Sequence, residues 1–120
     1  MLFRSLLIDG LVLRYSTATL VDALPAGEGT FLACSFWLAD SDVLTGRRSE
    51  AEALFERLLA LGNDVGLFAE EYEPRTKRML GNFPQALTHM SLVNTARLLS
   101  IPEKVAKRAS ARGERPGANA

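Results

Sequence analysis

The stretch that decides the fold runs from Gly66 to His89 and reads GLFAEEYEPRTKRMLGNFPQALTH. It places three carboxylates within four positions, after an apolar approach and before a turn. Glycoside hydrolysis needs carboxylates around an acetal, because one protonates the leaving oxygen and the other activates water or attacks. If the acidic segment is extended, Glu70 and Tyr72 share one side, whereas Glu71 and Glu73 share the other. Only one of the two adjacent acids can then point into a given pocket.

The second half of this stretch contains a helix-opening signal, Gly-Asn-Phe-Pro at 81–84. Asn82 can cap a helix, and Pro84 fits its first turn. Apolar residues recur after it at helical spacing, and Ile101-Pro102 ends the pattern. The sequence therefore predicts a helix over 82–100 and an irregular or extended loop around Glu70.

Two more helices are predicted upstream, over 29–45 and 49–61. The first is apolar on most sides and belongs inside something larger, so the isolated chain is expected to self-associate. Gly46 ends it, and Ser49 with Glu52 forms a capping box that opens the second helix. The short connection predicts that the two helices lie antiparallel. Further upstream, Asp9-Gly10 between two apolar runs predicts a short N-terminal hairpin or an extended loop.

Composition limits the alternatives. The 120 residues suggest at most one domain, and 14 basic residues balance 14 acidic ones, so charge favours neither nucleic acid nor an anionic membrane as a partner. Cys34 is the single cysteine, expected to be a small buried helical residue, and the lone histidine lacks co-ligands for a metal. Without a signal peptide or a membrane span, the chain is predicted to be cytoplasmic. Residues 103–120 read as a basic, disordered tail.

Several motifs in order resemble glucoamylase-type glycoside hydrolases, the family of bacterial glucoamylases, glucodextranases and some trehalases. They are the stretch quoted above, GEGTFLACSFWL at 27–38 and AEALFERLLAL at 51–61. The resemblance spans residues 7–100 and is to the C-terminal part of these enzymes. Three positions depart from the family pattern: Lys77 replaces a usual Gly, Met79 a common Gln, and Leu87 an aromatic that could pack against a sugar.

The resemblance implies an inverting glycosidase whose fold is a toroid of six helical hairpins. The expected fold class is therefore all-α, with about three helices of a partial (α/α) toroid in residues 1–102. Glu70 occupies the position of the general base. The general acid follows a Trp-Glu motif in this family, but here Trp37 precedes Leu38. The chain is thus expected to be a C-terminal portion of an enzyme for α-glucosidic bonds, either a fragment of the catalytic domain or a truncated reading frame, with the base and without the acid. No cofactor is implied.

Four more residues are candidates for substrate binding. The resemblance places Arg14 and Tyr15 at the sugar site, and Arg14 is the best candidate for the cation that keeps Glu70 ionised. Glu28 either contacts sugar hydroxyls or simply stabilises the helix N-terminus that follows it. His89 either lines the site or is a core residue with one hydrogen bond.

A non-enzymatic helical interaction module is the alternative. One class of such modules repeats every 34 residues. Shifting Ala51, Leu54, Phe55 and Leu58 by 34 positions gives Gln85, Thr88, His89 and Leu92, and only the last pair matches. The sequence therefore does not support a repeat. A small enzyme complete in itself would need a second catalytic acid, and the remaining acids fit helix surfaces and turns.

Overall fold

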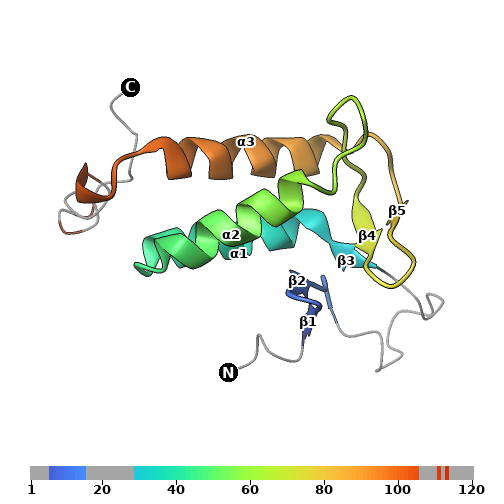
Figure 1. Ribbon diagram of the computed structural model, residues 1–120, viewed down its shortest axis with the longest axis horizontal. Coiled ribbons are helices and arrows are strands. Elements are labelled where there is room, and N and C mark those ends of the chain that lie inside the picture. Colours follow the sequence, from blue (N-terminus) through green and yellow to red (C-terminus); the bar gives the residue numbers. More distant parts are fainter. Residues whose placement is uncertain (1–5, 16–28, 106–110, 112, 114–120) are drawn as a thin grey trace.

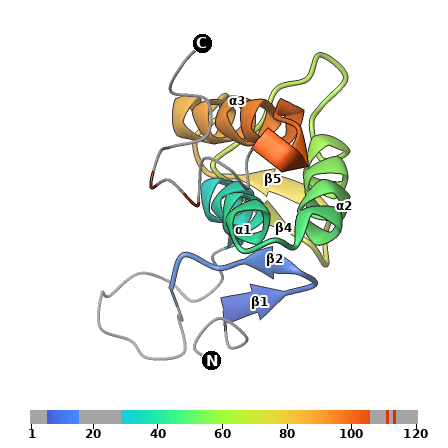
Figure 2. The ribbon, with the colours of Figure 1, turned by 90° about the vertical axis from the view of Figure 1, so that its left-hand side faces the viewer.

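Helix α1 lies at the centre of the fold, as the computed structural model of residues 6–15, 29–105, 111 and 113 shows (Figure 1). Helix α1 spans Leu32–Leu44, α2 spans Arg48–Leu59 and α3 spans Ala86–Ser100. Viewed along their axes in Figure 2, the helices occupy the corners of a triangle, with α1 against both α2 and α3. The predicted tail, residues 103–120, lies mostly outside the described residues.

The N-terminal hairpin is confirmed. Strands β1 (Leu7–Ile8) and β2 (Leu11–Val12) pair antiparallel, with Ile8 opposite Leu11. Between them Asp9 and Gly10 have φ angles of 50° and 74°, as a two-residue turn matched to the strand twist requires. The hairpin lies against α1, where the Ser35 hydroxyl accepts a hydrogen bond from the N–H of Val12 at 3.0 Å.

A second sheet, not predicted as such, organises the acidic segment. Strands β3 (Thr30–Phe31), β4 (Glu71–Glu73) and β5 (Arg78–Leu80) are antiparallel in the order β3-β4-β5. Phe31 lies opposite Glu71, which in turn lies opposite Leu80. The expected loop is thus partly a strand, and the first helix begins at residue 32 rather than 29, because the preceding residues pair with β4.

The predicted capping box at the start of α2 is wrong. The N-cap position is Arg47, and no side chain caps the helix. Ser49 already lies inside the helix, and Glu52 accepts a hydrogen bond from Arg48 Nε at 2.8 Å instead. The remaining nitrogens of Arg48 donate to the carbonyls of Leu99 and Ile101, at the end of α3. The start of α2 is therefore tied to the end of α3.

The predicted start of the last helix is also corrected. Helix α3 begins at Ala86 with Gln85 as its N-cap. Asn82 does not cap it, because Asn82 lies three residues before this N-cap, and no side chain caps the helix. The main chain of Asn82 is instead engaged with Glu70, as described below. The N–H of Gln85 donates to the carbonyl of Phe68 at 3.0 Å. Residues 81–85 therefore run as a connector held against the segment 68–70.

The core is built around Phe36, which is fully buried on α1. Its ring meets Phe55 of α2 at 6.1 Å between centroids and Phe68 at 6.3 Å, both edge to face. Leu11, Leu32 and Leu58 complete the buried cluster. Edge-to-face pairs add about 0.5–1.5 kcal/mol beyond burial. This cluster fixes Phe68, two residues before Glu70.

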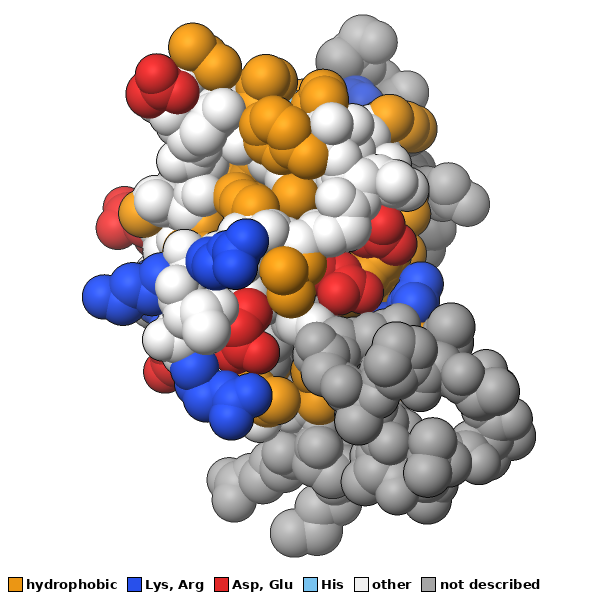
Figure 3. Space-filling view, turned by 90° about the vertical axis from the view of Figure 1, so that its right-hand side faces the viewer, with side chains coloured by type: hydrophobic (Ala, Val, Ile, Leu, Met, Phe, Trp, Pro, Cys, Tyr) orange, Lys and Arg blue, Asp and Glu red, His pale blue; other side chains and the backbone are white. Residues whose placement is uncertain are grey.

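Apolar side chains also remain on the surface. Trp37 and Leu44 of α1 are 48% and 57% exposed, and Met90 and Val93 of α3 are 68% and 63% exposed. Figure 3 shows hydrophobic side chains gathered on the upper part of one face, with charged side chains mostly below them. No described helix is both long and apolar enough to cross a bilayer.

Candidate active site

The main chain of Glu70 is held from both sides. Its N–H donates to the carbonyl of Asn82 at 2.9 Å, and its carbonyl accepts from the N–H of Leu32 at 3.1 Å. One residue earlier, the carbonyl of Ala69 accepts from the buried hydroxyl of Thr88 on α3 at 2.9 Å. Glu70 is therefore fixed at the point where the start of α1, the start of α3 and strand β4 meet.

The Glu70 side chain has two kinds of electropositive neighbour. Oε2 accepts a hydrogen bond from the N–H of Asn82 at 3.2 Å, and Oε1 lies 3.9 Å from Nη1 of Arg14. The side chain is 21% exposed. The carboxylate of Glu70 therefore has donors on two sides and partial access to solvent.

Arg14 is itself placed by aromatic rings. Its guanidinium carbon lies 4.9 Å from the ring centroid of Tyr15 and 5.3 Å from that of Phe31, and Nη2 donates to the Tyr15 hydroxyl at 3.3 Å. A guanidinium within about 6 Å of a ring face is attracted to it. Sequence reasoning did not identify Phe31 as part of the site, although it stands in the GEGTFLACSFWL motif.

Cys34 extends this neighbourhood by one turn of α1. It is partly rather than fully buried, so the prediction of a buried position is only half right. Burial raises the pKa of the Cys34 thiol above its ordinary value, and the charge of Arg14 partly offsets this. A raised pKa leaves the thiol protonated and a poor nucleophile. Cys34 is therefore not expected to react as a nucleophile, and the pKa of its thiol depends on the charge of Arg14.

Glu71 faces another way, as the alternation along an extended chain predicts. It is 8% exposed, and its Oε2 accepts a hydrogen bond from the N–H of Gly29 at 3.1 Å. This bond joins β4 to the residue before β3. Of the two adjacent acids, Glu70 thus lies beside Arg14, whereas Glu71 is buried and links β4 to the residue before β3.

The other two candidates differ in what the structure shows. Glu28 lies outside the described residues. His89 has main-chain partners on both ring nitrogens: Nε2 accepts from the N–H of Phe68 at 3.2 Å, and Nδ1 lies 2.6 Å from the carbonyl of Gln85. With Nε2 as the acceptor, Nδ1 is the ring nitrogen that donates to the Gln85 carbonyl. The ring also packs edge to face on Phe68, at 5.7 Å between centroids.

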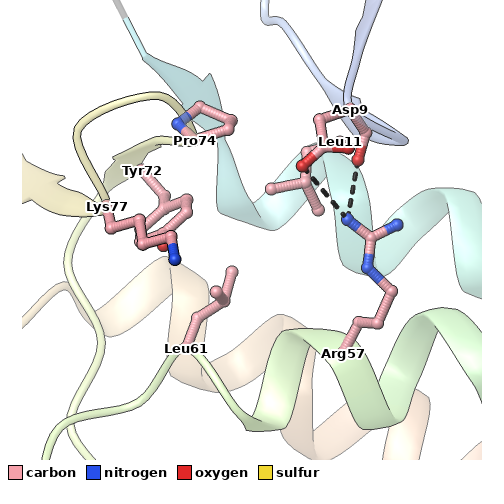
Figure 4. A pocket seen from close by; sticks show the side chains of 7 residues that line it. All are labelled: Asp9, Leu11, Arg57, Leu61, Tyr72, Pro74 and Lys77. Carbon is pink, nitrogen blue, oxygen red and sulfur yellow. Dashed lines mark hydrogen bonds and ion pairs between the residues drawn. The ribbon is translucent and has the colours of Figure 1, made fainter.

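A small pocket lies elsewhere, between the N-terminal hairpin, α2 and the β4–β5 turn (Figure 4). Its volume is about 110 Å³, and its lining includes Asp9, Arg57, Tyr72 and Lys77 but none of the predicted site residues. Arg57 donates to the Asp9 carbonyl at 2.7 Å and lies 3.8 Å from its carboxylate. The pocket is thus separate from the predicted site, and its arginine is already paired with Asp9.

Among the residues that the structure describes, no group of three or more His, Cys, Asp or Glu side chains could hold a metal ion.

The comparisons with known proteins identify the family of the chain. The model of glycosyl hydrolases family 15 matches residues 2–97, so the chain belongs to this family. Its helices and short sheet are therefore part of that family's helical toroid. No solved structure matches the chain.

The relatives carry a more particular name. The chain is 55% identical over 86 residues to a trehalase of Mycolicibacterium smegmatis and 52% identical over 86 residues to a trehalase of Mycobacterium tuberculosis. Each match covers 72% of this chain and 13% of the relative. A trehalase of Thermoplasma acidophilum is 36% identical over 91 residues, which is 76% of this chain and 15% of that relative. The chain thus spans about an eighth of the length of these relatives.

Proposed function

We propose that this chain supplies the general base of an inverting glycoside hydrolase acting on α-glucosidic bonds, and that Glu70 is this base. The observation that carries the proposal is the setting of the Glu70 carboxylate, 3.9 Å from Arg14, hydrogen-bonded to the N–H of Asn82 and still 21% exposed. A base must be ionised to accept a proton and must be reachable by water. The buried Glu71 satisfies the second condition poorly.

In the proposed reaction, a water molecule attacks the anomeric carbon from the face opposite the leaving group. Glu70 takes a proton from this water as the new C–O bond forms. The glycosidic C–O bond breaks, and a carboxylic acid on the other side gives its proton to the leaving oxygen. That acid belongs to a part of the domain beyond these 120 residues, because the chain lacks the Trp-Glu motif.

The proposed substrate contacts follow from the same geometry. Arg14 and Tyr15 form one unit beside Glu70, suited to bind hydroxyls of the sugar next to the bond that is cleaved. Glu28 stays a predicted contact. For His89, whose two ring nitrogens are both engaged with the main chain, we propose a supporting role that holds Phe68 and Gln85 in place near Glu70. The relatives named trehalase favour trehalose among the α-glucosides.

The test is a pair of isosteric substitutions in a complete catalytic domain that carries these residues. Glu70→Gln keeps the shape and removes the proton acceptor, so kcat should fall by about 10²–10⁴-fold, the usual contribution of a general base. Glu71→Gln is the matched control and should retain most of the activity. Release of glucose from trehalose and maltose measures both. A larger loss in Glu71→Gln than in Glu70→Gln would overturn the assignment.

The alternative, a helical interaction module without catalysis, is distinguished by the same assay, because Glu70→Gln would then leave hydrolysis in the complete domain unchanged. On the catalytic proposal, the 120-residue chain by itself should hydrolyse neither sugar.

We also propose that the protein works in the cytoplasm and that the chain either pairs with the rest of its domain or self-associates through its exposed apolar side chains.

A further inference from the structure

Gly81, the residue after β5, lies so close to Glu70 that any side chain at position 81 would collide with the Glu70 side chain. It adopts a φ angle of +76°. A β-carbon built on Gly81 would lie 2.9 Å from Glu70 Oε2, 3.0 Å from Glu70 Cβ and 3.4 Å from Glu70 Cδ. The side chain of Glu70 thus occupies the space that a side chain at position 81 would fill.

The neighbouring main chain shows why this contact matters. Asn82 binds Glu70 twice: its carbonyl accepts the N–H of Glu70 at 2.9 Å, and its N–H donates to Oε2 at 3.2 Å. Both bonds require the chain at 81–82 to run against Glu70 at close range. Just before them, Leu80 pairs with Glu71 in the sheet, so the approach is set by strand register. Figure 1 shows this segment joining β5 to α3.

We infer that Gly81 is a positioning residue for the carboxylate of Glu70: it lets the chain pass close enough for the N–H of Asn82 to hold Oε2, on the side away from Arg14. This inference rests on the proposed function of Glu70. A methyl group at position 81 forces Oε2 away from the N–H of Asn82. Because a displacement of about 1 Å can cost a factor of about 10² in rate, Gly81→Ala should lower kcat by about that factor and change KM much less.

The chain offers a closely matched control. Gly66 has the same φ angle, +76°, but nothing lies within 4 Å of a β-carbon built on it. Gly66→Ala therefore carries the same backbone strain without the contact to Glu70. If strain or lost stability alone lowered the activity, the two substitutions would act alike. A specific effect of Gly81→Ala on kcat separates positioning from a general structural role.

The experiment has two arms. In the 120-residue chain, the amide resonance of Asn82 should respond to acidification, because its hydrogen-bond acceptor is a carboxylate, and Glu70→Gln should abolish this response. We expect Gly66→Ala to keep the response and Gly81→Ala to lose it. In a complete catalytic domain carrying these residues, kcat and KM for trehalose are measured for the same variants and for the Gly81→Ala/Glu70→Gln pair. In that double variant, kcat should lie less than about 3-fold below that of Glu70→Gln alone, since the effects of residues that act as a unit are not additive.

The outcomes are distinct. Loss of both the Asn82 response and kcat in Gly81→Ala, but not in Gly66→Ala, supports the inference. If either property survives in Gly81→Ala, or if Gly66→Ala loses as much, the inference is wrong while Glu70 can still be the base. If Glu70→Gln leaves kcat unchanged, the proposed function itself fails, whatever the variants of Gly81 do.

Discussion

Replacing His89 by phenylalanine tests whether this residue supports the site or touches the sugar. The substitution keeps an aromatic ring against Phe68, where the present ring centroids are 5.7 Å apart. It removes the acceptor of the Phe68 N–H and the donor to the Gln85 carbonyl. The structure predicts that the main effect is on stability, because both ring nitrogens are engaged with the main chain.

The two lost bonds are not equal. Phe68 is 3% exposed, and a buried donor left without an acceptor costs about 1–3 kcal/mol. The carbonyl of Gln85 still accepts the main-chain N–H of His89 at 3.3 Å. Losing its second bond, to the ring Nδ1, therefore costs only about 0.5 kcal/mol, the low end for a hydrogen bond. We therefore expect the free energy of unfolding to fall by about 1.5–3.5 kcal/mol, which corresponds to a drop in Tm on the order of 6–14 °C for a chain of this size.

Urea unfolding of the 120-residue chain, followed by circular dichroism, measures this loss as a lower midpoint at an unchanged slope. His89→Gln is the comparison, since an amide oxygen can replace the acceptor at Nε2 and should limit the loss to about 1 kcal/mol. Stability of His89→Phe within about 0.5 kcal/mol of the parent would refute the reasoning. So would a His89→Gln variant of the complete domain with normal stability and a KM for trehalose raised more than about 10-fold, which is the signature of lost substrate binding.

Three further predictions use other parts of the chain. Burial raises the pKa of the Cys34 thiol and Arg14 opposes this, so Arg14→Gln should move the pH profile of iodoacetamide alkylation to higher pH; a shift to lower pH would contradict the geometry. Arg48→Met removes charged donors from the carbonyls at the end of α3 and should lower the unfolding free energy by about 1–2 kcal/mol in urea titrations; an unchanged midpoint would show that these bonds contribute nothing. Trp37 and Met90 are 48% and 68% exposed, so replacing both by glutamine should reduce self-association seen by light scattering, and an unaltered mass would place the contact elsewhere.

Some features of the fold were determined by local sequence. Asp9-Gly10 predicted the hairpin because few dipeptides tolerate two positive φ angles, and both residues have them. The helices were found within a few residues because apolar side chains recur with the helical period. Their starts were misplaced where tertiary partners replaced the expected caps, as when Arg48, rather than Ser49, formed the side-chain bonds at the start of α2. A cap is an option that a sequence offers, and a competing partner decides whether it is used.

For the site, the sequence by itself supplied the prediction of the chemistry: a family motif, two adjacent acids of which one can face a pocket, and an arginine suited to accompany the proposed base. Only the tertiary structure decided their arrangement. Strands of two or three residues carry almost no periodicity, so the β3-β4-β5 sheet could not be read in advance. That sheet turns Glu71 inward to Gly29 and brings Glu70 between Arg14 and the N–H of Asn82. Residues far apart in the chain meet there because strand register and the packing of Phe68 on Phe36 fix distances that no local pattern records.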